Sequence, residues 1–226
     1  MKRKIRILFL FLAALLLFFP SPAHAEVVRK NEKAGKKIAL SFDDGPSRRN
    51  TEEILSILKE YHVHATFFVI GENAQRDPER IRSIFCAGHE IGNHTYTHAY
   101  LTKINKQAIR EEILKTEKVL IEITGEKPTL FRPPGGYYDA DSLRVLDEMG
   151  YTSVLWSLDT KDWRMPKTET IVSKVEGNAS DGDIILFHDL EDARFSTPKA
   201  LRIIIPYLIE NGYEIVTVSE LLREGA

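Results

Sequence analysis

Two neighbouring carboxylates, Asp43 and Asp44, precede a pair of histidines, His94 and His98, that stand four positions apart. One aspartate and two histidines form a ligand set that suits a divalent metal ion and leaves coordination positions open for water and substrate. The other carboxylate would lie beside the ion, where a base is needed to take a proton from that water. These residue types therefore predict hydrolytic chemistry at a metal centre.

Each of the two segments also has an ordinary structural explanation. Asp43-Asp44-Gly45-Pro46 consists of residues that favour turns, and two histidines four apart can simply be solvated residues of a helix. However, neighbouring carboxylates repel each other unless a cation holds one of them. Histidines at this spacing share one face if their turn is helical. The combination favours a metal site over two unrelated surface segments.

Three later segments add further chemical groups. His188 follows an apolar run at 184–187, and an imidazole that is protonated near neutral pH can serve as a general acid. Residues 131–136 contain two prolines and two glycines, which predicts a rigid turn whose backbone N–H groups could bind an oxyanion. Arg132 in this turn could pair with the base carboxylate. Residues 156–163 mix acids with tryptophans, and they could supply an acid that orients His188 and an aromatic wall for a sugar ring.

Between these segments, short apolar runs alternate with amphipathic helical stretches. The predicted strands are residues 37–42, 65–70, 90–92, 129–132, 152–155, 183–187 and 214–217. The predicted helices are residues 51–61, 78–87, 105–124, 141–149, 168–179 and 198–211. About seven strand-plus-helix units imply an α/β fold with a parallel sheet, either closed as a barrel or open and doubly wound. Nothing in the sequence divides this pattern, so we predict a single domain over residues 37–226.

The chemical groups fall where the predicted strands end. Asp43 and Asp44 follow the first strand, His94 follows the third, Arg132 ends the fourth and His188 follows the sixth. In a parallel barrel, the carboxyl ends of the strands form one rim on which loops from different strands converge. The predicted architecture therefore gathers the predicted chemistry in one place.

The first 25 residues have the pattern of an export signal. The chain begins with basic residues, continues with an apolar run at 5–19 that only Arg6 interrupts, and reaches an A-x-A cleavage site at 23–25. The apolar run is shorter than the ~20 residues that span a bilayer comfortably, so we predict a cleaved signal peptide at 1–25, with an N-terminal membrane anchor as the alternative. A short polar leader at 26–36 is predicted to precede the domain. The mature protein would be extracellular or associated with the cell wall, without a stable membrane span.

Charge and cysteine content exclude several classes of protein. Removing residues 1–25 takes away four of the 31 basic residues and none of the 33 acidic ones, so the mature chain carries six more acids than bases. That balance argues against a nucleic-acid partner, which would need a clustered basic surface, and it suits a sugar substrate of low charge. A single cysteine, Cys86, rules out an internal disulfide, and we expect it to be a buried thiol.

Taken in order, the five segments resemble those of the polysaccharide deacetylases, the NodB-homology domain of carbohydrate esterase family four. The resemblance extends over about residues 36–222, and five motifs in the same order are far more specific than any one of them. It implies a distorted (β/α) barrel that removes N-acetyl, and sometimes O-acetyl, groups from sugar polymers such as peptidoglycan and chitin. It also implies one divalent metal ion, usually Zn²⁺, with Co²⁺ or Ni²⁺ in relatives.

The resemblance also assigns roles to individual residues. It implies that Asp44, His94 and His98 are the metal ligands and that Asp43 is the general base. It further implies that Arg132 positions the base, that Asp162 supports His188 as the general acid, and that Trp163 and Leu186 line a pocket for the acetyl methyl group. Gly135 stands where many members carry an aromatic residue, so the chain keeps that backbone N–H as an oxyanion donor and lacks the aromatic part of the groove wall.

The sequence thus predicts a monomeric deacetylase that releases acetate from a cell-envelope polysaccharide, with peptidoglycan preferred over chitin-like oligomers of N-acetylglucosamine. Three alternatives stay open: an acetyl-ester hydrolase that acts on xylan-like polymers, an amidase that acts on smaller acyl amides, and a catalytically silent carbohydrate-binding protein. A metal-dependent phosphoesterase is disfavoured, because the sequence lacks the extra carboxylates and basic side chains expected around a phosphate.

Overall fold

The computed structural model describes residues 27–192 and 194–225, so the predicted signal peptide at 1–25 lies outside the described residues. Cleavage of that segment and export of the protein therefore stay predictions. Over the described ranges, no helix combines the length and the hydrophobicity that crossing a bilayer requires.

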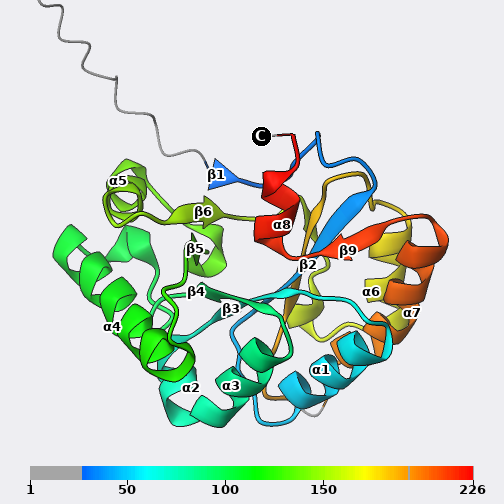
Figure 1. Cartoon of the computed structure of the whole chain (residues 1–226), viewed down its shortest axis with the longest axis horizontal. Coiled ribbons are helices and arrows are strands. Elements are labelled where there is room, and N and C mark those ends of the chain that lie inside the picture. The colour runs from blue at the N-terminus through cyan, green and yellow to red at the C-terminus, as the bar shows by residue number, and fades with distance from the viewer. Residues whose placement is uncertain (1–26, 193, 226) are drawn as a thin grey trace, which may run out of the picture.

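Strands and helices alternate along most of the chain (Figure 1). The strands are β1 (Val27–Val28), β2 (Lys37–Asp43), β3 (Thr66–Val69), β4 (Glu90–Asn93), β5 (Leu130–Phe131), β6 (Thr152–Val154), β7 (Leu158–Asp159), β8 (Ile184–His188) and β9 (Glu214–Val216). The helices are α1 (Asn50–Glu60), α2 (Gly71–Arg76), α3 (Pro78–Cys86), α4 (Lys106–Thr124), α5 (Ala140–Glu148), α6 (Thr168–Glu176), α7 (Thr197–Glu210) and α8 (Val218–Arg223).

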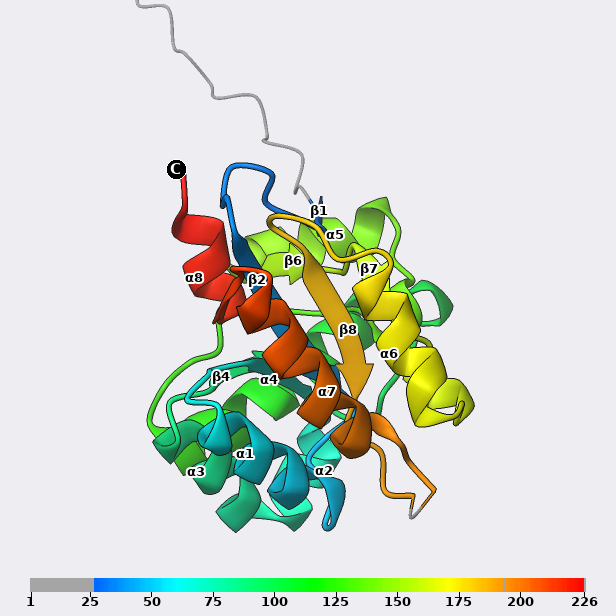
Figure 2. The same ribbon diagram turned by 90° about the vertical axis from the view of Figure 1, so that its right-hand side faces the viewer.

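The strands form one curled sheet. Its order is β1-β6-β5-β4-β3-β2-β8-β7, with β9 paired to β2, and every strand pair in the described part of the chain is parallel. Figure 1 shows α4, α2, α3, α1, α7 and α6 arranged around the outside of this sheet. In the view of Figure 2, α7 and α6 flank β8. The predicted distorted (β/α) barrel is confirmed.

All seven predicted strands are present, and the elements that the sequence did not predict are short. They are the two-residue strands β1 and β7 and the six-residue helices α2 and α8. Most elements of this length contain too few positions to show a hydrophobic period, so they become visible only through the neighbours with which they pair or pack. The two-residue β5 is an exception, because its place between two long helical stretches indicated a strand.

The structure corrects the prediction of a polar leader at 26–36. Val27 and Val28 pair with Ser153 and Val154 of β6, so this segment forms an edge of the sheet. The Asn31 side chain donates hydrogen bonds to two carbonyl groups near the end of α8, those of Leu221 (2.7 Å) and Glu224 (3.0 Å). Ala34 is buried. The segment therefore joins the first edge of the sheet to the C-terminal helix, although its sequence is polar.

A row of three phenylalanines crosses the middle of the sheet on its outer face. Phe42 of β2 stacks on Phe67 of β3, with ring centroids 5.0 Å apart, and on Phe187 of β8 at 5.7 Å. These rings belong to the core cluster that includes the buried faces of α1 and α7. Burial of each ring contributes roughly 1.5–3 kcal/mol, so the row fixes the register of the central strands firmly.

The alternate positions of β2 and β8 face the inside of the curled sheet. Side chains alternate along a strand, so Ser41 and Asp43 point opposite to Phe42, just as Leu186 and His188 point opposite to Phe187. Asp43 is the register partner of His188. The packing of the outer face therefore brings these two chemical groups side by side at the carboxyl ends of their strands.

The prediction that Cys86 is a buried thiol is wrong. Cys86 is exposed at the last residue of α3, whose buried positions are Ile81 and Ile84. A residue two positions after Ile84 lies about 200° around the helix, on the face that turns away from the core.

We expect Asn31→Ala to lower the free energy of unfolding by roughly 1–3 kcal/mol, because it removes the donor for two partly buried carbonyl groups near the end of α8. Chemical denaturation measures this change. The matched control is Asn178→Ala, since within the described residues the Asn178 side chain bonds only to the carbonyl of Lys174 one turn away. Equal stability of the two variants would show that the hydrogen bonds of Asn31 to the end of α8 do not stabilise the fold.

Candidate active site

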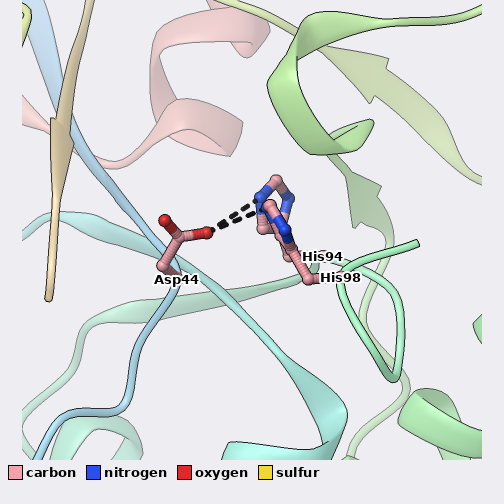
Figure 3. Close-up of side chains that lie close together, drawn as sticks. All are labelled: Asp44, His94 and His98. Atoms are coloured by element: carbon pink, nitrogen blue, oxygen red, sulfur yellow. Dashed lines mark ion pairs between the residues drawn. The ribbon is translucent and has the colours of Figure 1, made fainter. Parts of the chain in front are cut away.

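Three potential metal ligands, called the triad below, converge at the carboxyl ends of β2 and β4. They are Asp44, His94 and His98. Asp44 Oδ1 lies 3.5 Å from His94 Nε2 and 3.2 Å from His98 Nε2. Figure 3 shows both imidazoles beside the same carboxylate oxygen. The proximity that the spacing of these residues predicted is therefore present in the fold.

A backbone carbonyl fixes the orientation of His94. Its Nδ1 lies 2.7 Å from the carbonyl oxygen of Arg132. Because a carbonyl only accepts hydrogen bonds, Nδ1 must carry the hydrogen, and the lone pair of the neutral ring is then on Nε2, the atom nearest Asp44. A hydrogen bond of this kind on the far side of the ring is what orients histidines that bind metals.

The side chains of this triad fit a metal ion. Their ligand atoms all lie within 4.8 Å of one another, one from each residue. Asp44 Oδ1 is buried and has no hydrogen-bond partner within the described residues, and an orphaned buried oxygen is costly unless something binds it. A set of two imidazoles and one carboxylate suits Zn²⁺ and neighbouring transition metals.

The electrostatics of the triad favour binding of a cation. Burial by itself would raise the pKa of Asp44, but contacts with His94 and His98 outweigh it and hold that pKa below its usual range. The same contact with Asp44 raises the pKa of His98. Asp44 is therefore ionised, and a metal ion would compete with a proton for His98.

Asp43 forms a buried ion pair with Arg132. Arg132 Nη1 lies 2.7 Å from Asp43 Oδ1, and Arg132 has no exposure to solvent. The guanidinium also donates to Ser41 Oγ (3.0 Å) and to the carbonyl groups of Val154 (3.3 Å) and Leu155 (2.9 Å). One oxygen of Asp43 is thus held, while the other, Oδ2, lies 3.9 Å from the His94 Nε2 atom of the triad.

His188 pairs with the buried carboxylate of Asp162. The Nδ1 atom of His188 lies 2.8 Å from Asp162 Oδ1, and Asp162 Oδ2 accepts from the His188 N–H and from the Thr197 hydroxyl. Burial alone would lower the pKa of His188, but Asp162, with help from Asp43 and Asp44, raises it to about 9. The imidazole therefore carries a proton near neutral pH.

Three further residues were predicted from the resemblance. Leu186 is buried on the inner face of β8, two residues before His188. Trp163 directly follows Asp162 and exposes 45% of its surface. Gly135 has a left-handed φ of +64°, and its N–H forms no hydrogen bond within the described residues. Leu186 and Trp163 are thus close in sequence to His188 and Asp162, and Gly135 stands three residues after Arg132.

A side chain at position 135 would require two neighbouring rings to move. A Cβ atom there would lie 2.9 Å from the ring of Tyr100 and 2.9 Å from that of Tyr137. Tyr137 is 59% exposed and packs edge-on against Tyr100, whose ring packs in turn against His98. Two tyrosines from other positions therefore supply the aromatic surface that the sequence seemed to lack at this point.

Glu112 of α4 was missed by the sequence analysis. Its carboxylate accepts hydrogen bonds from the backbone N–H groups of Tyr96 and Thr97 (both 2.8 Å) and from the Thr97 hydroxyl (3.0 Å). Tyr96 and Thr97 belong to the loop that joins the two histidines of the triad. In this loop Thr95 and His98 itself have left-handed φ angles of +65° and +60°. Residues other than glycine hold such angles only when their surroundings fix them, so Glu112 positions the loop.

The first turn of α2 holds the other side of the same loop. The N–H groups of Gly71 and Glu72 donate to the carbonyl groups of Thr95 and Tyr96 (both 2.9 Å). This approach needs a glycine, because a Cβ atom on Gly71 would lie 2.5 Å from Thr116 Oγ1. The loop is therefore held between α2 and α4, and the only sequence signal was a glutamate on the face of a long helix.

Asp189 supports the loop that carries Asp44. Its N–H donates to the carbonyl of Asp43 (2.8 Å), and its buried carboxylate accepts from the hydroxyls of Ser47 (2.6 Å) and Thr51. Burial raises the pKa of Asp189 to about 6. A Cβ atom on Gly45 would lie 2.5 Å from the Asp189 carboxylate, so glycine is needed there.

These features define a class of protein: a parallel α/β barrel whose rim gathers a potential metal-binding triad, a buried Asp–Arg pair and a buried Asp–His pair. Comparison with known families agrees. The polysaccharide deacetylase family matches residues 30–154. The chain belongs to the polysaccharide deacetylase family.

Individual relatives cover most of the chain. It is 44% identical over 198 residues to a peptidoglycan-N-acetylglucosamine deacetylase of Bacillus cereus, a match that spans 87% of this chain and 91% of that protein. The crystal structure of the Bc1960 peptidoglycan N-acetylglucosamine deacetylase aligns with a TM-score of 0.84 at 37% identity, over 86% of this chain and 92% of that one. A family 4 acetyl xylan esterase from Clostridium thermocellum, solved with a cobalt ion, aligns with a TM-score of 0.76 at 35% identity, over 83% and 91%.

We expect Glu112→Ala to weaken metal binding by about 10–100-fold, because the loop that carries His98 loses the acceptor for two N–H groups. Competition with a chromophoric chelator measures the affinity of the metal-free protein for Zn²⁺. Glu111→Ala is the control, since the one hydrogen bond of the Glu111 side chain within the described residues comes from Gln107 on the exposed face of the same helix. Thermal melting of both metal-free variants checks folding. Equal Zn²⁺ affinities in the two variants would contradict the role given to Glu112.

Proposed function

We propose that this chain is a metal-dependent deacetylase that hydrolyses N-acetyl groups on a cell-wall polysaccharide, with peptidoglycan as its main substrate. Membership of the polysaccharide deacetylase family and 44% identity to a peptidoglycan-N-acetylglucosamine deacetylase support this activity. The observation that carries the proposal is the arrangement of Asp43 and His188, which lie side by side on β2 and β8 next to the triad. A base and an acid in this arrangement can act on the same amide bond.

Asp44, His94 and His98 would hold one divalent ion. We propose Zn²⁺, with Co²⁺ or Ni²⁺ as possible substitutes, and the cobalt ion in the related acetyl xylan esterase supports a site of this chemistry. An ion in this position supplies a Lewis acid that polarises the acetamide carbonyl and acidifies water.

Asp43 would act as the general base. Its Oδ1 atom is committed to Arg132, so Oδ2, the oxygen nearer the triad, is free to take a proton from the attacking water. The buried positive charge of Arg132 keeps the carboxylate ionised and fixes its orientation. Arg132 is thus proposed as a positioning residue.

His188 would act as the general acid. An amine leaves poorly as an anion, so the nitrogen needs a proton as the C–N bond breaks. The imidazole of His188 carries that proton because the buried carboxylate of Asp162 stabilises the charged ring. Hydrogen bonding to Nδ1 leaves Nε2 as the atom that donates.

Gly135, Trp163 and Leu186 would surround the acetyl group. The N–H of Gly135 is proposed to donate to the oxyanion of the tetrahedral intermediate, and its lack of a partner in the described residues supports that role. Trp163 and Leu186 supply apolar surface near His188 and are proposed to contact the methyl group.

We further propose that residues 27–225 form the catalytic unit, which is exported and works as a monomer on the wall polymer. The export signal predicted at 1–25 and the similarity to wall-modifying enzymes support this.

A second candidate is hydrolysis of acetyl esters on a xylan-like polymer. The structural likeness to an acetyl xylan esterase favours it, since the same base and electrophilic centre would serve an ester. The leaving group of an ester is an alkoxide, which is a weaker base than the nitrogen anion of an amide, so ester hydrolysis depends less on the general acid. Acetate release by the wild type from an O-acetylated xylan, compared with release from an N-acetylated glycan, separates the two candidates. His188→Ala should lower activity on the glycan more than activity on the xylan.

Acetate release from purified peptidoglycan tests the main proposal. We expect release that stops with a chelator and returns with Zn²⁺, and a fall in turnover of about a hundredfold in Asp43→Asn, which loses the base but keeps an acceptor for Arg132. The variant should still bind Zn²⁺, whereas His94→Ala or His98→Ala should lose both the metal and activity. Full activity in Asp43→Asn would refute the assignment of the base, and saturable sugar binding without acetate would indicate a silent binding protein.

The dependence of activity on pH tests the acid. Because Asp162 raises the pKa of His188, the active protonated form persists up to that pKa and is lost as the pH rises through it. Asp162→Asn removes the negative charge, so the basic limb of the kcat/KM profile should shift to lower pH. Asp159→Asn is the control, since the Asp159 carboxylate bonds to the Lys161 N–H instead. An unchanged basic limb in Asp162→Asn would mean that His188 is not the titrating acid.

A further inference from the structure

A cavity of about 620 Å³ opens directly from the triad. Asp44 and His98 line one part of it, and Asn73, whose side chain donates to the Asp44 carbonyl (2.9 Å), lies in the same wall. Arg48 and Arg76 line it as well. A ligand that reaches the triad therefore lies in a space that two guanidinium groups also share.

The two arginines come from separate segments. Arg48 belongs to the loop between β2 and α1, four residues after Asp44, and Arg76 is the last residue of α2. Both are exposed, and neither side chain forms an ion pair or a hydrogen bond in the described ranges 27–192 and 194–225. Arg80, close by on α3, differs, because it pairs with Asp77 (3.0 Å) and Glu52 (3.7 Å).

Three of the four acids that line the cavity form hydrogen bonds or ion pairs within the protein. Asp77 caps α3 and pairs with Arg80, and the Asp189 carboxylate accepts the hydroxyls of Ser47 and Thr51. Glu191 accepts the backbone N–H of Arg48. The fourth acid, Asp44, belongs to the triad. Within the described residues none of the four forms an ion pair with Arg48 or Arg76, so both guanidinium groups keep their charges available to a ligand.

Helix stability explains the position of only one of the two arginines. A cation in the last turn of a helix is favourable, and that accounts for Arg76 at the end of α2. It does not account for Arg48, which lies in a loop, or for the convergence of both residues on the cavity of the triad.

We propose that Arg48 and Arg76 form a subsite for a carboxylate on the glycan whose acetamide is hydrolysed, an inference that rests on the proposed function. Guanidinium groups bind carboxylates with directed, charge-assisted hydrogen bonds. Peptidoglycan carries free carboxylates on its peptide substituents, and on its lactyl groups where the peptide is absent, whereas chitin-like oligomers are neutral. The subsite therefore selects peptidoglycan-type glycans over chitin-type glycans.

Three substrates with glycan chains of equal length separate charge from bulk. The first is N-acetylchitotetraose, the second a peptidoglycan tetrasaccharide with free peptide carboxylates, and the third the same tetrasaccharide with these carboxylates capped as methyl amides. Acetate release by the Zn²⁺-loaded wild type is compared with that by Arg48→Ala, Arg76→Ala and the double variant. Arg49→Ala is the matched control, because Arg49 is exposed beside Arg48 and does not line the cavity.

We expect the double variant to lose about fivefold or more in kcat/KM on the free-carboxylate substrate, through KM, as two partly exposed charged contacts would contribute. Its activity on the other two substrates should stay within about twofold of wild type, and added salt should weaken only the charged substrate. Equal losses on all three substrates, or no loss on the charged one, would overturn the subsite.

Failure of the proposed function gives a different result. If the wild type releases acetate from none of the substrates, the deacetylase assignment is wrong. Equilibrium binding of the free and capped tetrasaccharides then still tests the subsite. Tighter binding of the free form that disappears in the double variant supports the subsite, and equal binding of the two forms refutes it.

Discussion

Arg132 carries a positive charge at a position without exposure to solvent, and groups from several strands surround it. Its guanidinium donates to Ser41 and Asp43 of β2 and to carbonyl groups at the end of β6, and it lies 4.0 Å from the centre of the Phe68 ring. Burying an ion costs several kcal/mol unless its partners compensate, so loss of any of these partners would destabilise the fold. The same contacts that stabilise the barrel around Arg132 therefore also fix the geometry of the site.

The backbone of Arg132 extends this constraint to the triad. Its N–H donates to the carbonyl of Asn93, and its carbonyl accepts from His94 Nδ1. The residue that orients the proposed base thus also orients one proposed metal ligand. The distance between a base and a metal decides whether one water molecule can contact both, and here one residue sets the position of each.

The long helices and the chemical groups at the carboxyl ends of strands could be predicted from the sequence. Asp43, Asp44, His94 and His188 could be found because a parallel sheet gathers strand ends at one rim, which follows from the alternation of strands and helices alone. Glu112 and Asp189 could not, because their roles depend on how α4 and the loop after β8 pack against other loops. The exposure of Cys86 could have been predicted from the sequence, because a position two residues after the apolar Ile84 lies on the opposite face of the helix.

Two buried pairs have opposite polarity, and under the proposed mechanism they would set the direction of proton transfer. In one, a guanidinium holds the carboxylate that is proposed to accept a proton, and in the other a carboxylate holds the imidazole that is proposed to give one. Both supporting groups, Arg132 and Asp162, are fully buried, whereas the groups that they support reach the inner rim of the barrel. Pairs of titratable groups whose surroundings push their proton affinities apart are the physical basis of acid and base catalysis at a single pH. Because the partners that set this difference are beyond the reach of a substrate, variation in the surrounding loops can change which polymer is bound without reversing the roles of acid and base.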